Sequence, residues 1–200
     1  LIGRKEILSL PTHLSFPQVL RADNKVFIYP ESGESRELWL YEYDTDKDEL
    51  TGEKRRLADM ALADATILPF DKTKMLATSS VPNGNVMDIL CWDGDAKKYE
   101  ICDSYTFDEN VARNAGPCFQ MGDRLIRPAQ VSNHSYGEAL ELQEIMVEDG
   151  GSMRFNALCR WHSPHPTHTL SFHNFCVHDG IAAVDCRGYR YWFSKHLESM

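Results

Sequence analysis

One pattern, repeated four times along the chain, limits what this sequence can fold into. Each copy is a short apolar strand, a tight polar turn and a second apolar strand. The turns centre on Asp23-Asn24, Asp71-Lys72, Gly122-Asp123 and Asp179-Gly180. Aspartate, asparagine and glycine are favoured in hairpin turns because they tolerate positive φ or cap the turn with their side chains. The copies recur at roughly 50-residue intervals, which indicates a repeated β unit.

A second pair of strands is expected between successive hairpins. In Leu38-Trp39-Leu40-Tyr41-Glu42-Tyr43, apolar and polar residues alternate as in a strand with one buried face. Four short strands in each unit of about 50 residues are typical of propeller blades. We find no long segment with a helical period. The sequence therefore predicts an all-β fold, a single β-propeller domain over 1–200, with units at 15–62, 63–113 and 114–166 and a partial unit at 167–200.

The number of blades stays open at this point. A closed ring usually takes about four to eight blades, and the last unit is long enough for only part of one. The N-terminal "GRKEILSL" has the pattern of an outer strand. Either this strand completes the last blade and closes the ring, or an upstream blade is missing and the ring is incomplete.

Charge and hydropathy exclude several classes of partner. Hydrophobic residues make up 42% of the chain and charged residues 26%, as in ordinary globular proteins. The net charge of −9 argues against a nucleic-acid partner, which would need a basic surface. No apolar run approaches the roughly 20 residues of a membrane span, and the N-terminus does not resemble a signal peptide.

The six cysteines, Cys91, Cys102, Cys118, Cys159, Cys176 and Cys186, include no Cys-x-x-Cys pair. Most lie in apolar strand-like runs, so we expect buried free thiols rather than disulfides or a zinc site. This expectation favours a reducing compartment, and we place the chain in the cytoplasm.

Neither a cofactor nor a metal is expected. His162, His165 and His168 are spaced three apart, but Pro164 and Pro166 exclude a helix, so a shared metal would need a loop. The alternating aspartates at 44, 46 and 48 resemble a calcium loop, but Glu49 and Arg55 replace its glycine and final glutamate, which favours a solvated hairpin tip. The sequence contains no glycine-rich phosphate loop and no nucleophile elbow.

Polar residues gather where the strands of each unit should meet at one end of the propeller. In a blade, the first and third strands start at this end and the second strand finishes there. The residues so placed are His13, Ser15, Glu31 and Ser32; Asp64, Thr78 and Ser79; Arg113, Asn114, Arg127, Gln130, His134, Tyr136 and Glu138; and His168, Asp185 and Arg187. Carboxylates and arginines beside a tyrosine suit a hydroxyl-rich ligand such as a sugar. Alternatively, these residues are only solvated strand ends, and Arg127 pairs with Glu138 across its hairpin.

Several pieces of the sequence, taken in order, resemble a known family. "HLSFPQVL…VFIYPES", "ADATIL", "RLIRPAQ…YGEALEL" and "THTLSF…GIAAVD" are similar to the N-terminal domain of glucosamine inositolphosphorylceramide transferases and its bacterial relatives. The resemblance runs from about His13 to Asp185. It implies a five-bladed β-propeller similar to family 43 and family 32 glycoside hydrolases, with an upstream blade that this chain lacks.

The resemblance also carries an expectation about catalysis. The related hydrolases use an aspartate on the first blade as general base, with an aspartate and a glutamate on the next two blades. Here the second-blade position reads "HLSFP", without an aspartate, and the third carries Asp64. Glycoside hydrolysis needs two carboxylates about 5–9 Å apart. The catalytic candidates in this chain are Glu31, Asp64 and Glu138.

We therefore expect a carbohydrate-active propeller that binds or processes a glycosyl group of a carbohydrate or glycoconjugate. Arg127 and Gln130 would orient hydroxyl groups, and the full set of substrate-binding candidates is His13, Ser32, Arg127, Gln130, Tyr136, His168 and Asp185. The alternative is a non-catalytic sugar-binding or scaffolding module for a partner enzyme such as a glycosyltransferase. A third option is a protein-interaction propeller, for which the aromatic cluster "YRYWF" at 189–193 would be the contact surface, although strand packing explains this cluster at least as well.

Overall fold

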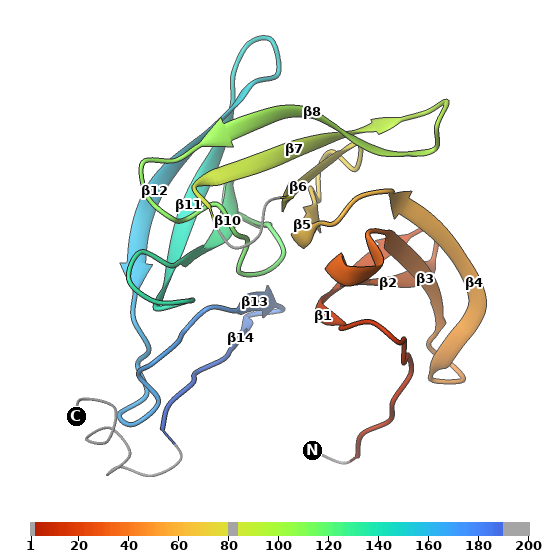
Figure 1. Cartoon of the computed structure of the whole chain (residues 1–200), viewed down its shortest axis with the longest axis horizontal. Helices are drawn as coiled ribbons and strands as arrows, with labels where there is room; N and C mark the ends of the chain where they lie inside the picture. The colour runs from red at the N-terminus through yellow and green to blue at the C-terminus, as the bar shows by residue number, and fades with distance from the viewer. Residues whose placement is uncertain (1–2, 80–83, 190–200) are drawn as a thin grey trace.

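The computed structural model describes residues 3–79 and 84–189 and shows an all-β chain. Three antiparallel sheets of four strands and one of two strands are arranged around a common centre, like blades of a propeller (Figure 1). The first strands β1, β5 and β13 lie towards this centre, and the last strands β4, β8 and β12 lie on the outside. In each four-stranded sheet the strands pair with their neighbours in the sequence. This pairing matches the predicted pattern of repeated hairpins.

The first sheet contains β1 (Ser15–Ala22), β2 (Lys25–Glu31), β3 (Leu38–Asp44) and β4 (Glu49–Ala58), and a short 3-10 helix, Gly33–Ser35, precedes β3. The predicted turn at Asp23 and Asn24 is formed, with φ of 50° and 59°. Positive φ at both central residues is the geometry of a tight hairpin turn that suits the twist of its strands.

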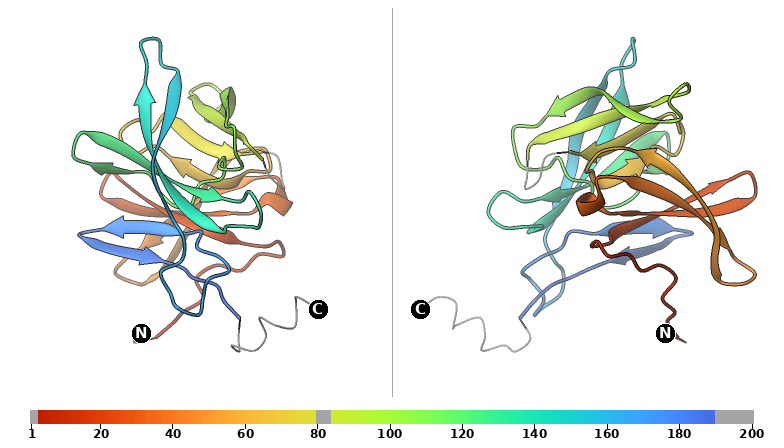
Figure 2. Two further views of the ribbon diagram at one scale, coloured as in Figure 1. Left: turned by 90° about the vertical axis from the view of Figure 1, so that its left-hand side faces the viewer. Right: turned by 45° about the vertical axis from the view of Figure 1, so that its right-hand side comes forward.

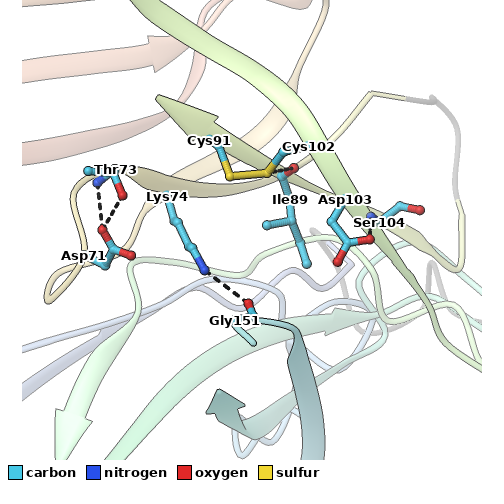
Figure 3. The surroundings of a disulfide bond; sticks show 9 residues. All are labelled: Asp71, Thr73, Lys74, Ile89, Cys91, Cys102, Asp103, Ser104 and Gly151. Atoms are coloured by element: carbon cyan, nitrogen blue, oxygen red, sulfur yellow. Dashed lines mark hydrogen bonds between the residues drawn. A yellow bond between two sulfur atoms is a disulfide. The ribbon is translucent and has the colours of Figure 1, made fainter. Parts of the chain in front are cut away.

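The second sheet contains β5 (Ala63–Ile67), β6 (Lys74–Thr78), β7 (Val86–Asp93) and β8 (Lys98–Thr106). Cys91 on β7 and Cys102 on β8 form a disulfide, as Figure 3 shows. The expectation of free thiols was therefore wrong for this pair. The two residues come together because β7 and β8 are antiparallel neighbours, and this pairing register cannot be read from cysteine spacing alone. Cys118, Cys159, Cys176 and Cys186 are free.

The third sheet contains β9 (Phe119–Met121), β10 (Arg124–Val131), β11 (Ala139–Val147) and β12 (Met153–Trp161), and the fourth contains β13 (Phe175–His178) and β14 (Ile181–Val184). Views from two further directions show the sheets stacked successively against one another (Figure 2). The predicted turns at Gly122 and at Asp179 and Gly180 are present, each with positive φ.

Hydrophobic side chains fill the spaces between successive sheets. Leu38 and Leu40 of the first sheet share a cluster with Met75 and Leu90 of the second. A further cluster joins the second and third sheets, and another joins the third sheet to the start of the fourth. Burial of apolar area between neighbouring sheets supplies most of the stability of such an arrangement, at about 25 cal/mol per Å². Strands β1, β5 and β13, together with residues 115–118 just before β9, border a central cavity of about 950 Å³.

Two predictions from the sequence concern the ends of the chain. The segment "GRKEILSL" forms no strand within the described residues 3–10, so it does not complete the fourth sheet. Instead, the Lys5 amine donates a hydrogen bond to the backbone carbonyl of Asp48 at the tip of the first sheet.

The aromatic cluster at 189–193 lies outside the described residues except for Tyr189. Within the described ranges, we find no helix with the length and apolar character needed to cross a membrane.

Candidate functional site

Asp64 lies at the centre of a polar cluster near the start of β5. Its backbone has a φ of 50°, and the pairing of β5 with β6 shifts between Ala63 and Thr66. The same irregularity occurs in β1, where Phe16 has a φ of 43° and the register shifts between Ser15 and Gln18. Phe16 and Asp64 therefore occupy equivalent positions in two successive sheets. Non-glycine residues with positive φ are uncommon, and such local strain is often found at functional sites.

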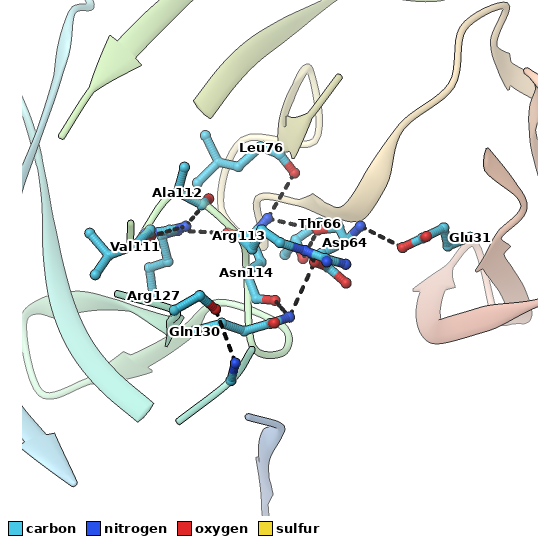
Figure 4. Close-up of polar contacts among 12 residues, drawn as sticks. Glu31, Asp64, Thr66, Leu76, Val111, Ala112, Arg113, Asn114, Arg127 and Gln130 are labelled. Atoms are coloured by element: carbon cyan, nitrogen blue, oxygen red, sulfur yellow. Dashed lines mark hydrogen bonds and ion pairs between the residues drawn. The ribbon is translucent and has the colours of Figure 1, made fainter. Parts of the chain in front are cut away.

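The neighbours of Asp64 come from three different segments. Its backbone amide donates to Glu31 Oε2 over 2.8 Å. Its side-chain oxygen Oδ2 accepts from Arg113 Nε and, over 3.1 Å, from Gln130 Nε2 (Figure 4). Burial raises the pKa of Asp64 to about 6; Arg113 opposes this rise, and Glu31 adds to it. A carboxyl group with such a pKa can both give and accept a proton near neutral pH.

Tyr136 and His173 extend the cluster towards the fourth sheet. The Arg113 guanidinium lies over the Tyr136 ring, 5.3 Å from its centroid. The Tyr136 ring packs edge-on against His173 with 5.2 Å between centroids. His173 Nδ1 contacts Asp185 Oδ2 at 2.7 Å. Burial lowers the pKa of His173, Asp185 raises it, and Arg113 lowers it further. We call Glu31, Asp64, Arg113, Tyr136, His173 and Asp185 the mouth cluster.

Gly137 allows the loop that carries Tyr136 to approach the fourth sheet. Its φ is 61°, and a Cβ atom there would lie 2.5 Å from the Cβ of His173. The Gly137 carbonyl accepts a hydrogen bond from the Phe172 amide over 2.8 Å. Only glycine meets both the backbone requirement and the space requirement at this position.

Arg127 supports the cluster from behind and does not reach its surface. The side chain is fully buried, and its guanidinium packs against the rings of Phe107 and Phe155. Its guanidinium donates hydrogen bonds to the carbonyls of Val111 and Ala112 and to the side chains of Asn114 and Gln143. Burial lowers its pKa to about 10. The expected role in orienting ligand hydroxyls is thus corrected, because the guanidinium is shielded from any ligand. The alternative pairing with Glu138 is not formed either, since Arg127 lies opposite Gln143.

Asn114 connects this buried arginine to Asp64. Its Oδ1 accepts from Arg127 Nε, and its Nδ2 donates to the backbone carbonyls of Asp64 and Leu76, over 2.7 and 3.0 Å. The segment that carries Arg113 is therefore held on both sides by buried hydrogen bonds. Such networks fix one arrangement because an unpaired buried polar group is costly, at about 1–3 kcal/mol each.

Four of the other predicted site residues, Glu138, His13, Ser32 and His168, have partners outside the mouth cluster. Glu138 accepts from the backbone amides of His134 and Ser135 and contacts the His134 ring. Burial works to raise the pKa of Glu138, but these hydrogen bonds outweigh it and leave the pKa below its ordinary value. His13 donates its backbone amide to Glu34, Ser32 is buried against Thr12, and His168 contacts His165. Gln130 is buried but donates to Asp64, so it supports the cluster.

The structure brings together Glu31, Asp64, Tyr136 and Asp185 of the predicted candidates and adds Arg113 and His173. Arg113 is among the polar strand-end residues predicted from the sequence, whereas His173 is not. One signal was present: "SFHN" at 171–174 resembles "SFPQ" at 15–18, so an alignment of the repeats would have placed His173 at a strand start. No group of three or more potential metal ligands occurs among the described residues.

Of the mouth cluster, Asp185 lines the central cavity. It does so with Phe16 and Asn174 near the starts of β1 and β13, whereas Arg21, Lys72 and His178 line the cavity near the β1–β2, β5–β6 and β13–β14 turns. The cavity walls between these two groups are mostly apolar, from residues such as Tyr29, Ile67 and Phe175. The mouth cluster thus combines carboxylates, an arginine and a half-exposed aromatic ring at the rim of a cavity, which is the usual setting of a small-molecule site.

Comparisons with known proteins agree with this architecture. Residues 6–154 match the family model described as glucosamine inositolphosphorylceramide transferase 1, N-terminal. Two curated relatives, both named glucosamine inositolphosphorylceramide transferase 1, come from Oryza sativa subsp. japonica and subsp. indica. Each is 28% identical over 142 residues, which cover 66% of this chain and 19% of the relative. The chain thus spans about a fifth of the length of these relatives.

A solved structure shares the fold. It is a family 43 glycoside hydrolase, a β-1,3-galactosidase with galactodeoxynojirimycin, and it aligns with a TM-score of 0.53 over 72% of this chain and 46% of the hydrolase. At 13% identity this similarity shows the fold alone. With the family match covering most of its length, the chain belongs to the family of the glucosamine inositolphosphorylceramide transferase N-terminal domain, with a fold like that of family 43 glycoside hydrolases.

Proposed function

We propose that the chain binds a glycosyl group at the mouth cluster, as part of glycan or glycoconjugate metabolism. The observation that carries this proposal is the arrangement of Asp64, Arg113 and Tyr136 beside Glu31. Carboxylates and a guanidinium can bind neighbouring hydroxyls, and a half-exposed tyrosine ring offers an apolar surface for a sugar ring. The curated relatives are named as transferases, and their name includes the sugar glucosamine, which supports a glycosyl ligand.

Within this proposal, Glu31 and Asp64 are the acid/base candidates. The carboxyl group of Asp64, with its pKa of about 6, is partly protonated just below neutral pH. Glu31 is held beside it by the Asp64 amide. Glu138 is a weaker candidate, because its hydrogen bonds favour the ionised form and tie it to its own loop.

The five-bladed ring implied by the resemblance is also part of the proposal. The described residues form three four-stranded sheets and a two-stranded one around the central cavity. A fifth sheet would lie between the first sheet and the β13–β14 sheet. It would cover the side of the central cavity that faces the space between these two sheets. Its first strand would bring another residue to the mouth, as β1 and β5 bring Phe16 and Asp64.

Binding of simple sugars tests the proposal. Ligand-observed NMR with methyl galactoside, methyl glucoside and galactodeoxynojirimycin should show contact with the wild-type protein. The Tyr136→Ala variant should bind about tenfold more weakly, a loss of about 1.4 kcal/mol. Phe70→Ala is the matched control, because Phe70 is another exposed aromatic residue, located at the β5–β6 turn. If Tyr136→Ala and Phe70→Ala bind the sugars equally well, the mouth cluster is not the binding site.

A second candidate function is a non-catalytic sugar-binding or scaffolding module that positions a partner enzyme such as a glycosyltransferase. The equivalence of Phe16 and Asp64 favours this alternative, because the first sheet supplies an aromatic residue where the second supplies a carboxylate. Incubation with aryl glycosides and nucleotide sugars separates the two functions. Turnover that is lost in Asp64→Asn would exclude the non-catalytic module, whereas sugar binding without turnover would support it.

A further inference from the structure

A second, smaller cavity of about 320 Å³ lies beside the mouth cluster and shares Arg113 and Tyr136 with it. Its other side chains come from Asn110, Ser132, His134 and Ser135. We call it the side cavity. Its volume is near the lower end of the range of about 300–1,000 Å³ for ligand sites, which suits one sugar ring. The two shared residues make it continuous with the mouth.

The side cavity contains polar groups with unused hydrogen-bonding capacity. Arg113 binds Asp64 through Nε, and within the described ranges its two terminal nitrogens donate to no other residue. The Ser132 hydroxyl oxygen accepts from the Gly137 amide over 3.0 Å, which leaves its proton to donate. The Ser135 hydroxyl has no partner in the part of the chain that the structure describes. Several donors and acceptors thus surround one small space.

The charges around the side cavity favour a neutral ligand. The positive charge of Arg113 is compensated by Asp64, whose side chain it contacts directly. His134 contacts Glu138, which is held ionised by its hydrogen bonds. An anionic ligand would therefore find no net positive charge to bind. Hydroxyl groups, in contrast, can donate to or accept from every one of the unused groups.

We infer that the side cavity is a second sugar subsite, which binds a neutral pyranose ring next to the glycosyl group at the mouth. Tyr136 borders both positions: Arg113 covers one face of its ring, the His173 ring packs against it in a T-shaped arrangement, and about half of the residue is exposed. This inference rests on the proposed function of the mouth cluster and adds that the natural ligand has at least two sugar units.

Comparison of monosaccharides with disaccharides tests this inference. The probes are methyl galactoside and methyl glucoside, with β-1,3-galactobiose and cellobiose as their two-unit counterparts, and affinity is measured by calorimetry or NMR titration. We expect at least one disaccharide to bind about tenfold more tightly than its monosaccharide, the factor given by about 1.4 kcal/mol of additional contact. The Ser135→Trp variant, which fills the side cavity, should abolish this difference and leave monosaccharide binding unchanged.

Ser104→Trp is the matched control, because Ser104 is an exposed serine on β8 outside both cavities. It should retain the preference for the disaccharide. Ser135→Leu is a second, smaller filling variant, and thermal melting shows that each variant is folded. If mono- and disaccharides bind equally to the wild type, or if Ser135→Trp keeps the preference, the second subsite is refuted while the mouth site stands. If none of the four sugars binds, both the mouth site and the second subsite are refuted.

Discussion

The backbone amide of Asp64 donates a hydrogen bond to the Glu31 carboxylate over 2.8 Å, which ties the start of the second sheet to the end of β2 in the first. This contact holds Asp64 in its positive-φ conformation and brings two acidic residues from different sheets together. Arg113, on the segment between β8 and β9, compensates the charge of Asp64, and His173 with Asp185, which flank β13 and β14, completes the cluster. The geometry of this one polar cluster therefore depends on how all four sheets pack against one another.

Replacement of Asp64 by asparagine should change how stability depends on pH. The folded-state pKa of Asp64, about 6, lies above its ordinary value of 3.8, so the folded state binds the proton more tightly than the unfolded state. The stability that Asp64 contributes is therefore full below pH 4 and is lost as the pH rises from about 4 to 6. Between pH 4 and pH 7 the stability difference between wild type and Asp64→Asn should change by up to about 3 kcal/mol.

Urea denaturation at a series of pH values measures this change. Asp95→Asn serves as the control, because Asp95 is exposed in the β7–β8 turn and distant from the cluster in the chain. Parallel pH profiles for the wild type and Asp64→Asn would contradict the raised pKa.

Loss of the Arg127 guanidinium should strongly destabilise the protein. Arg127→Leu leaves the carbonyls of Val111 and Ala112 and the side chains of Asn114 and Gln143 without their donor. Buried polar groups without partners cost about 1–3 kcal/mol each, so we expect a loss of about 3 kcal/mol or more in the free energy of unfolding. Arg154→Leu is the control, since Arg154 is exposed and, among the residues that the structure describes, forms an ion pair with Glu148 alone. A loss below about 1 kcal/mol in Arg127→Leu, as expected for an exposed arginine, would refute the supporting role.

The disulfide between Cys91 and Cys102 should be detectable and stabilising. Alkylation of the denatured, unreduced protein should modify four of the six cysteines, because four are free. The double variant Cys91→Ser/Cys102→Ser should lose about 3 kcal/mol of stability, as expected from loss of a cross-link that closes a short loop. Cys159→Ser, which removes a free thiol, should not lose this stability. Modification of all six cysteines would show that the pair is not oxidised.

Asp185 should control the protonation of His173. Burial lowers the pKa of His173 below its ordinary value of 6.5, and the neighbouring carboxylate of Asp185 partly restores it. Removal of that charge in Asp185→Asn should therefore lower the pKa of His173 further. NMR titration of the imidazole ring protons in both proteins gives the two values. An equal or higher pKa in the variant would mean that Asp185 does not act on this ring.

The lowered pKa of His173 should also make the stability of the folded protein depend on pH. Because the folded state disfavours protonated His173, the contribution of this residue is present above the unfolded pKa of 6.5 and is lost as the pH falls below it. The Asp185→Asn variant should be more sensitive to this fall in pH than the wild type. Denaturation curves at pH 5.5 and 7.5, chosen as about one unit on either side of the ordinary histidine pKa, measure the effect.

The all-β architecture could be predicted from local pattern alone. Alternating residues such as Leu38 to Tyr43 bury one face of a strand, and turn residues such as Asp23 and Asn24 have the positive φ that a tight hairpin needs. Both properties depend on residues close together in the sequence. They therefore predicted the repeated hairpins, their turns and the group of strand ends among which Asp64, Tyr136 and Asp185 were found.

Contacts between strands and sheets were decided by the tertiary structure. The pairing of β7 with β8 places Cys91 opposite Glu100, and Cys102, which lies at a shift in that register, forms the disulfide with Cys91. The packing of the third sheet buried Arg127 while it left Tyr136 half exposed. The fourth sheet then brought His173 onto Tyr136 through the space that Gly137 leaves open. Such outcomes depend on which distant segments share a desolvated space, and local sequence patterns carry information about strand faces and turns but not about these long-range neighbours.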